Sequence, residues 1–372
     1  MSSKQTASRG VITWLWLTCA LLLAMIIVGG VTRLTGSGLS IVRWEPIIGA
    51  LPPQDSAQWQ RVFALYQESP QYQLVNHGMD LEAFKSIFWW EYFHRLLGRG
   101  IGLVVGLPLI AFWLTGRLSR RRTLALAGIF ALGGLQGVVG WLMVRSGLVD
   151  LPQVSHYRLT LHLGIGFLIF GLVFWQALSV SFGEGRARRV AHMDPQLRLH
   201  VVGFLLLVCV TVLCGGLVAG LKAGQAFPTF PLMAGYWVPP GLFACEPLWR
   251  NFVDSAVTVH FQHRVLALLV TFATGYLALR AFRAPPQLGL RRAASLLTLA
   301  VALQVVLGVV TVLLSVPVWA GAAHQVNAAL LLAATLNLMH VLSASVPEPV
   351  PEPRRRPSAL APALVSRAAL RE

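Results

Sequence analysis

The stretch WWEYFHRLLGR (residues 89–99) runs, after one glycine, into IGLVVGLPLIAFWL (residues 101–114), so charged and titratable side chains stand at the start of a long apolar run. These side chains belong to Glu91, His94, Arg95 and Arg99. Charges at membrane depth are costly, so they are kept where they pair with one another or serve a function. The stretch therefore predicts a membrane helix with a functional end.

The composition indicates a membrane protein. Of the 372 residues, 56% are hydrophobic and only 12% are charged, and the mean hydropathy is +0.66. Soluble globular domains carry about twice that share of charge. Runs of about 20 apolar residues are long enough to cross a bilayer as helices. Eight such runs are predicted, at about residues 11–32, 93–115, 123–144, 159–181, 200–221, 259–279, 294–316 and 322–343.

The net charge of +16 does not indicate nucleic-acid binding, because the basic residues follow the membrane topology. Most of the 30 Lys and Arg residues lie in the two termini and in the short linkers after the second, fourth and sixth apolar runs. By the positive-inside rule these parts, and therefore both termini, face the cytoplasm. The first apolar run reads as a membrane helix, with no cleavable signal evident. We expect a multi-pass protein of a bacterial inner membrane, surrounded by lipid; the mitochondrial inner membrane is the alternative.

Two longer segments, residues 33–92 and 222–258, are expected on the outer side of the membrane. In the first, AQWQRVFALYQ (57–67) has apolar residues at helical spacing, which predicts an amphipathic helix on the membrane surface or over the helix ends. The second is rich in Pro, Gly and aromatic residues, which predicts an irregular lid. The expected units are a cytoplasmic N-terminus (1–10), an N-terminal four-helix bundle (11–181), a cytoplasmic linker (182–199), a C-terminal four-helix bundle (200–343) and a disordered cytoplasmic tail (344–372).

The chain also repeats itself. The matching stretches are GGVTRLTGSGLS (29–40) with GGLVAGLKAGQA (215–226), EYFHR (91–95) with HFQHR (260–264), and LQGVVG (135–140) with LQVVLG (303–308). Each copy holds an even number of apolar runs, so both copies cross the membrane in the same orientation. The expected fold is an all-α membrane protein in which two tandem four-helix bundles are related by a pseudo-two-fold axis along the membrane normal.

Four of the ten histidines fall at matched positions of this repeat, near the first turns of inward-running helices: His94, His162, His263 and His324. They should lie at similar depth in the outer leaflet, one pair in each bundle. Two imidazoles that face each other across a four-helix bundle are typical of bis-histidine haem ligation. Zinc is less favoured, since no Cys, Asp or Glu completes a tetrahedral set in both halves. For any single histidine, a buried structural role is the alternative.

Neighbouring charges add to this pattern. Arg95 and Arg264 directly follow two of the histidines, and a guanidinium suits the carboxylate of a haem propionate; the alternative is snorkelling toward lipid head groups. Glu91 lies three residues before His94 on one helix face, where the second copy has His260. An acid beside only one pocket indicates chemistry in that half, with the other haem as electron relay. The alternative is an i,i+4 ion pair between Glu91 and Arg95.

These residues stand in stretches that resemble haem A synthases, membrane enzymes of cytochrome oxidase assembly. The matching stretches are GGVTRLTGSGLSIVRWEPIIGALPP, EAFKSIFWWEYFHRLLGR, SHYRLTLHLGIGF, FQHRVLAL and AHQVNAALLL, and the resemblance covers roughly residues 11–343. It implies a haem-dependent oxidoreductase that converts the C8 methyl of haem O to a formyl group by successive hydroxylations. It also implies the cysteine-free branch typical of proteobacteria and mitochondria, because the first outer segment has no cysteine.

The resemblance further implies roles for residues of the first half. His94 and His162 match the histidines that hold the iron of the substrate haem, with Arg95 or Arg99 on a propionate. Glu91 matches the family's glutamate and is expected to act in catalysis together with His94. Stabilisation of positive charge at the methyl carbon and orientation of an attacking water are alternative roles for the carboxylate.

In the second half, the resemblance implies a haem B cofactor. His263 and His324 match the histidines that hold its iron, with Arg264 beside the cofactor. His260 leaves open which imidazole of that turn is the ligand, although the repeat favours His263. A haem O synthase and an electron-transfer partner are the further partners to expect.

The residues also leave room for other functions. A di-haem electron-transfer protein of the cytochrome b type would need the four histidines but not Glu91 or long outer segments. A transporter or assembly scaffold built on the repeat would use the histidines for its own substrate. A homo-oligomer is expected because Gly133, Gly134 and Gly137 allow close helix packing, either between chains or within one bundle.

Overall fold

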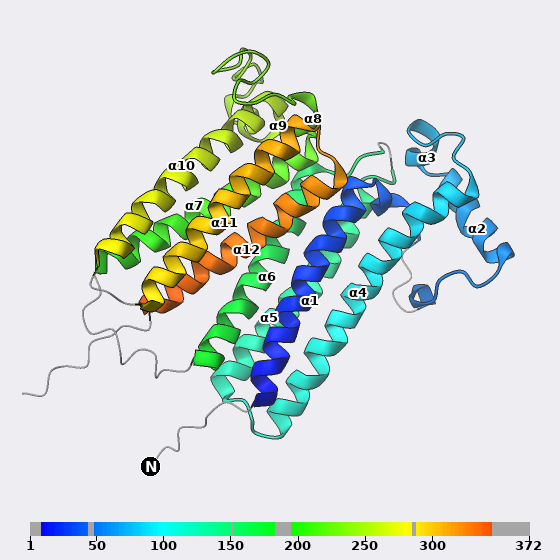
Figure 1. The fold of residues 1–372 in the computed structure, drawn as a ribbon. Coiled ribbons are helices and arrows are strands. Elements are labelled where there is room, and N and C mark those ends of the chain that lie inside the picture. Colours follow the sequence, from blue (N-terminus) through cyan, green and yellow to red (C-terminus); the bar gives the residue numbers. More distant parts are fainter. Residues whose placement is uncertain (1–8, 44–47, 150–151, 183–194, 285–287, 344–372) are drawn as a thin grey trace, which may run out of the picture.

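The computed structural model describes residues 9–43, 48–149, 152–182, 195–284 and 288–343 (Figure 1). Within these ranges the protein is helical and has no β-strand. By length and composition, eight of the described helices are able to cross a membrane. They are α1 (Arg9–Leu34), α4 (Leu81–Leu114), α5 (Arg120–Arg145), α6 (His156–Phe182), α7 (Pro195–Gly220), α10 (Ala256–Arg283), α11 (Leu288–Leu313) and α12 (Val318–Ser343). The predicted all-α membrane fold is confirmed.

These helices expose large apolar side chains. Leu103 and Leu107 on α4 and Phe272 on α10 are 62%, 64% and 72% exposed, respectively. Such a surface would promote association in water, whereas in a bilayer it faces lipid tails. The exposed apolar surface therefore agrees with a multi-pass membrane protein.

The eight long helices form two groups of four. In the first, α1 and α5 both contact α4 and α6; in the second, α7 and α11 both contact α10 and α12. The groups meet through α1, α6, α7 and α12 (Figure 1). Gln325 on α12 donates a hydrogen bond of 2.9 Å from Nε2 to the carbonyl oxygen of Ile26 on α1. The pseudo-two-fold axis and the domain boundaries stay predictions.

A hydrogen-bond network also joins the two groups at the helix ends opposite to the start of α1, which are called the outer ends after the predicted topology. The Oδ1 atom of Asp254, which follows α7 in the chain, lies 3.0 Å from Nε2 of His156 and accepts a hydrogen bond of 2.5 Å from the hydroxyl of Tyr157. Arg250 donates to the second carboxylate oxygen at 2.9 Å. These donors, Tyr157 first, hold the pKa of Asp254 below its ordinary value. The start of α6 is thereby fixed to the outer segment of the second group.

Helix α4 begins at Leu81, well before the apolar run that was predicted to start at residue 93. The side chain of Asp80 caps it by accepting a hydrogen bond from the N–H of Ala83. Residues 81–92 therefore belong to the helix rather than to the outer segment. His94 consequently lies inside a long helix and not near its first turns, which corrects that prediction.

The predicted amphipathic helix is present as α2 (Ser56–Gln67), and the side chain of Asp55 caps its first turn. Phe63 and Tyr66 on its apolar face pack on Phe84 of α4, with ring centroids 5.1 Å and 5.0 Å apart. Aromatic pairs at this spacing contribute beyond the area that they bury. The helix therefore covers the outer extension of α4.

The other described elements outside the membrane helices are short. They are η1 (Ser37–Leu39), η2 (Ile48–Ala50), α3 (Pro70–Leu74), α8 (Ala223–Ala226), η4 (Leu248–Arg250) and α9 (Asn251–Asp254). Elements α2, α3, α8 and α9 lie at the end of the helices opposite to Arg9 (Figure 1). The N-terminal residues 1–8, most of the predicted linker and the tail expected to be disordered (344–372) lie outside the described residues.

Tyr66 is the centre of the contact between α2 and α4. It is fully buried, and its hydroxyl accepts a hydrogen bond of 2.7 Å from Asn76 Nδ2 and donates one of 3.2 Å to Gln71 Oε1. We expect Tyr66→Ala to destabilise the outer segment by about 3–5 kcal/mol through the cavity that it leaves. Tyr66→Phe loses only the hydroxyl contacts and should cost about 1 kcal/mol. Limited proteolysis of the detergent-solubilised protein measures this opening.

Leu74→Ala is the control for this prediction, because Leu74 is 67% exposed. It should be cut at the wild-type rate. Cleavage of Tyr66→Ala at the same rate as this control would show that the buried ring does not hold the outer segment.

Candidate functional site

Each of the four repeat-matched histidines packs its imidazole against a glycine of a neighbouring helix. A Cβ atom added to that glycine would lie 2.9 Å from Cε1 for Gly29 and His94, 2.9 Å for Gly140 and His162, 3.2 Å for Gly215 and His263, and 3.0 Å for Gly308 and His324. Contacts this short leave no room for a side chain between backbone and ring. The glycines therefore allow each imidazole to lie directly on the adjacent helix.

These contacts follow the repeat. They join α1 to α4 and α5 to α6 in the first group, and α7 to α10 and α11 to α12 in the second. The four glycines stand within the repeated stretches that begin at residues 29 and 215 and that end at residues 140 and 308. The histidines were predicted from the sequence, but their glycine partners were not. These glycines could have been found from the repeat, because both copies of each stretch carry them at the same position.

The histidines form two pairs. His94 and His162 are close enough to interact electrostatically, and so are His263 and His324. The Nδ1 atom of His94 is buried and has no hydrogen-bond partner within the described residues. Nδ1 of His162 and Nδ1 of His263 are likewise buried without a partner among the described residues. The two ring nitrogens of His324 instead lie 3.3 Å and 3.2 Å from Gln304 Nε2. A buried imidazole nitrogen without a partner in the protein is available to a bound group.

A glutamine one turn before the glycine anchors the histidine helix in both groups. Gln136 Nε2 donates to the carbonyl oxygen of His162 at 2.8 Å, and Gln304 Nε2 donates to that of His324 at 3.1 Å. In the second group Asn327 donates to Gln304 Oε1 at 2.7 Å. The equivalent Oε1 of Gln136 is buried and has no partner within the described part of the chain. The glutamine of the first group therefore keeps an acceptor oxygen available, whereas the oxygen of its counterpart in the second group is bound by Asn327.

The Glu91 carboxylate is 2% exposed and is bound through both oxygens. Oε2 accepts hydrogen bonds of 2.7 Å from Ser40 Oγ and 2.8 Å from the N–H of Ile41. Oε1 forms the predicted i,i+4 ion pair with Arg95, at 2.6 Å from Nη2 and 3.1 Å from Nε. A buried charge so fully partnered has one defined orientation.

Arg95 and Arg264 hold the outer segments at equivalent carbonyl groups. Arg95 donates to the carbonyl oxygens of Ile41 at 2.9 Å and Arg43 at 3.4 Å. Arg264 donates to those of Phe227 at 3.3 Å and Thr229 at 2.7 Å. The accepting residues follow the GGVTRLTGSGLS and GGLVAGLKAGQA stretches at the same spacing. The sequence predicted that these guanidiniums bind a haem propionate, and it gave no indication of their contacts with the backbone.

His260 and Arg99, the two remaining residues of the predicted site, do not take part in the histidine–glycine contacts. His260 occupies the place of Glu91 in the second group and is 2% exposed, with its ring 6.2 Å from that of Phe227. The glycine contact made by His263, and not by His260, matches those of the other three histidines. Arg99 lies on α4 past His94, further from the outer end of the helix, and is partly buried.

Comparison with known proteins identifies relatives along nearly the whole chain. A family model described as cytochrome oxidase assembly protein matches residues 12–336. A heme A synthase of Nitrosospira multiformis is 47% identical over 339 residues, which cover 91% of this chain and 95% of the relative. A heme A synthase of Nitrosomonas eutropha is 47% identical over 349 residues, 92% of this chain and 97% of the relative. The chain belongs to the cytochrome oxidase assembly protein family.

Proposed function

We propose that this protein is a haem A synthase, which oxidises the C8 methyl group of haem O to a formyl group by successive hydroxylations. The relatives that carry this name align over nearly their whole length. The observation that carries the proposal is two imidazole pairs, each seated on glycines, with a buried carboxylate one turn from only one pair. An electron-transfer cytochrome with two equivalent haems would need no such difference.

In this proposal the first group of helices binds haem O. His94 and His162 hold the iron, because they pair within an apolar bundle and Nδ1 of His94 is buried without a partner among the described residues. Glu91 acts in catalysis from a fixed position, since Ser40, Ile41 and Arg95 hold both of its oxygens. It either stabilises positive charge that develops on the methyl carbon or orients the attacking water.

The second group binds haem B as a resident cofactor. His263 and His324 hold its iron, and Arg264 fixes the outer segment over this half through backbone carbonyls. Bound haem B supplies one-electron redox chemistry. This half has His260 at the position of Glu91, so it has no carboxylate there. The protein's own contribution here is to orient the two imidazoles and to exclude water from the space between the helices.

The proposed location is a bacterial inner membrane with both termini in the cytoplasm. Support comes from the basic residues at the inner helix ends, such as Arg121 and Arg283. A haem O synthase and an electron-transfer protein are proposed as partners. A homo-oligomer is also proposed, because side chains added at Gly133, Gly134 and Gly137 would meet nothing within 4 Å in one chain.

Extraction of the haems from the purified protein, expressed with a supply of haem O, tests the function. Chromatography should detect haem B together with haem O, a hydroxylated intermediate or haem A. Two equivalents of haem B per chain, unchanged by the haem O supply, would instead identify an electron-transfer cytochrome.

The glycine contacts predict that the two haem sites fail independently. Gly140→Ala should displace the His162 ring and lower retention of haem O by about tenfold, the size of effect seen when the support of a metal ligand is lost. Haem B should be retained. Gly308→Ala, which presses on His324, should give the reverse pattern. Haem content per chain, measured after extraction, provides both readouts.

Gly128→Ala is the matched control, since Gly128 lies on the same helix outside the proposed oligomer contact and an added Cβ there meets nothing within 4 Å. Its haem content should equal that of the wild type. If Gly140→Ala and Gly308→Ala both retain the two haems, the glycine contacts do not position the ligands.

Glu91→Gln separates binding from turnover. The amide keeps the size and two of the polar contacts of Glu91 but lacks its charge, so we expect haem O to stay bound while haem A formation falls by about a hundredfold or more. His263→Ala should instead lose haem B. Formation of haem A by Glu91→Gln at the wild-type rate would exclude a catalytic role for the carboxylate.

A further inference from the structure

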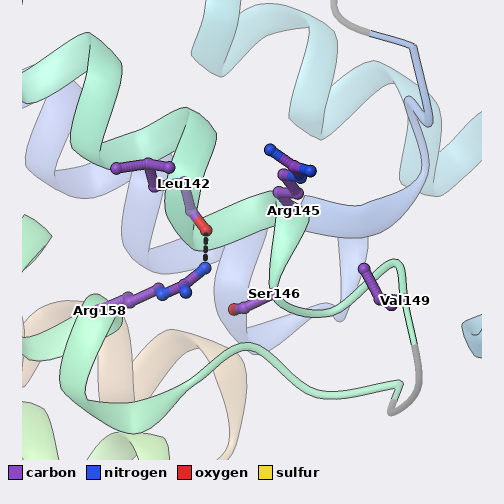
Figure 2. Close-up of a pocket in the computed structure, with 5 residues that line it drawn as sticks. All are labelled: Leu142, Arg145, Ser146, Val149 and Arg158. Atoms are coloured by element: carbon purple, nitrogen blue, oxygen red, sulfur yellow. Dashed lines mark hydrogen bonds between the residues drawn. The ribbon is translucent and has the colours of Figure 1, made fainter.

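An open pocket of about 370 Å³ lies at the outer ends of α5 and α6 (Figure 2). Its lining consists of Leu142, Arg145, Ser146, Val149 and Arg158. Two of these five residues carry a positive charge and none is acidic, so the pocket offers an environment for an anion.

The pocket lies beyond His162 toward the outer helix ends, and no histidine is among its described lining residues. Arg158 precedes His162 by four residues on α6, so both side chains share one helix face, with Arg158 about 6 Å nearer the outer end. Arg145 ends α5, the helix whose Gly140 packs on the His162 ring. Both arginines are exposed and belong to helix turns on the outer side of the turn that carries His162.

Within the part of the chain that the structure describes, neither arginine forms an ion pair. Arg158 Nη1 donates a hydrogen bond of 2.6 Å to the carbonyl oxygen of Leu142, as Figure 2 shows, which fixes the side chain but uses one of its five N–H donors. Arg145 lies over the ring of Trp141, with its guanidinium carbon 5.7 Å from the centroid. Each contact holds a guanidinium in place without neutralising its positive charge, because the partner is an uncharged carbonyl or aromatic ring.

The second group has no counterpart of this pair. The alignment of LQGVVG with LQVVLG places Leu313 opposite Arg145, and the alignment of His162 with His324 places Ala320 opposite Arg158. Leu313 is 50% exposed and Ala320 is fully buried. The two charges are thus particular to the half assigned to the substrate.

We propose that Arg145 and Arg158 form an oxyanion site that binds the propionate carboxylates of the substrate haem and turns them toward the outer membrane surface. This inference rests on the proposed function. A guanidinium binds a carboxylate through two parallel hydrogen bonds, and two guanidiniums match two propionates. Arg95, the cation next to His94, is already engaged by Glu91 and the Ile41 carbonyl.

The same chemistry also suits the phosphate of a lipid head group, and the two sources are separable with an esterified substrate. The experiment titrates haem O and haem O dimethyl ester into protein that was purified with haem B but without a haem O supply. The variants are wild type, Arg145→Gln with Arg158→Gln, and Arg61→Gln as an exposed outer arginine away from the pocket.

We expect the wild type and Arg61→Gln to bind the free acid about 10- to 100-fold more tightly than the ester, the range for hydrogen bonds between charged groups. The double variant should bind both ligands with the affinity that the wild type has for the ester. Its haem B content should be unchanged, which shows that it is folded. Arg158→Lys keeps the charge but not the paired geometry and should fall between the two.

An unchanged preference for the free acid in the double variant, accompanied by loss of co-purified anionic phospholipid, would overturn the inference in favour of a lipid site. Loss of the preference in Arg99→Gln instead would place the propionates at the inner arginine and also overturn it. If neither the wild type nor any variant binds haem O, the proposed function itself is refuted. This outcome is distinct from the others, in which the wild type binds haem O.

Discussion

At four places a helix backbone touches an imidazole, and these contacts set how closely four pairs of helices approach each other. Lipid supplies little hydrophobic force between helices, so close approach depends on small residues and on satisfied polar groups. At Gly29 and Gly140, and at their counterparts in the second group, one contact provides both, because the glycine lets the helices meet and seats the ring. A ring fixed to a neighbouring helix, rather than to its own alone, has its depth and direction set by two elements.

The two groups share this support and differ in what surrounds it. Glu91 corresponds to His260 in the repeat, and Oε1 of Gln136 has no partner among the described residues, whereas Oε1 of Gln304 accepts a hydrogen bond from Asn327. At these two positions the first group has a carboxylate and an acceptor without a partner among the described residues, whereas the second has an imidazole and a satisfied amide. Such divergence is expected if one half turns over a ligand that must enter, react and leave, while the other retains a permanent one.

Sequence predicted the features that depend on periodicity and composition. Runs of apolar residues located the eight membrane helices, and the spacing of Phe63 and Tyr66 located α2. The start of α4 was missed because Asp80 and the contact with α2 extend the helix beyond its apolar run. The glycine partners of the histidines and the carbonyl partners of Arg95 were missed because they lie far apart in the chain. Only packing brings them together.

The arginine contacts show how irregular backbone is held at the membrane surface. Near lipid, carbonyl groups outside regular structure need donors that water does not reliably supply. From within a membrane helix, Arg95 donates to two such carbonyls and Arg264 to four, so the outer segments are fixed at the depth of the histidines. A cation committed to the backbone has fewer donors left for a ligand. The carboxylates of a bound haem are then better served by guanidiniums elsewhere, and in the first group those lie at the outer ends of α5 and α6.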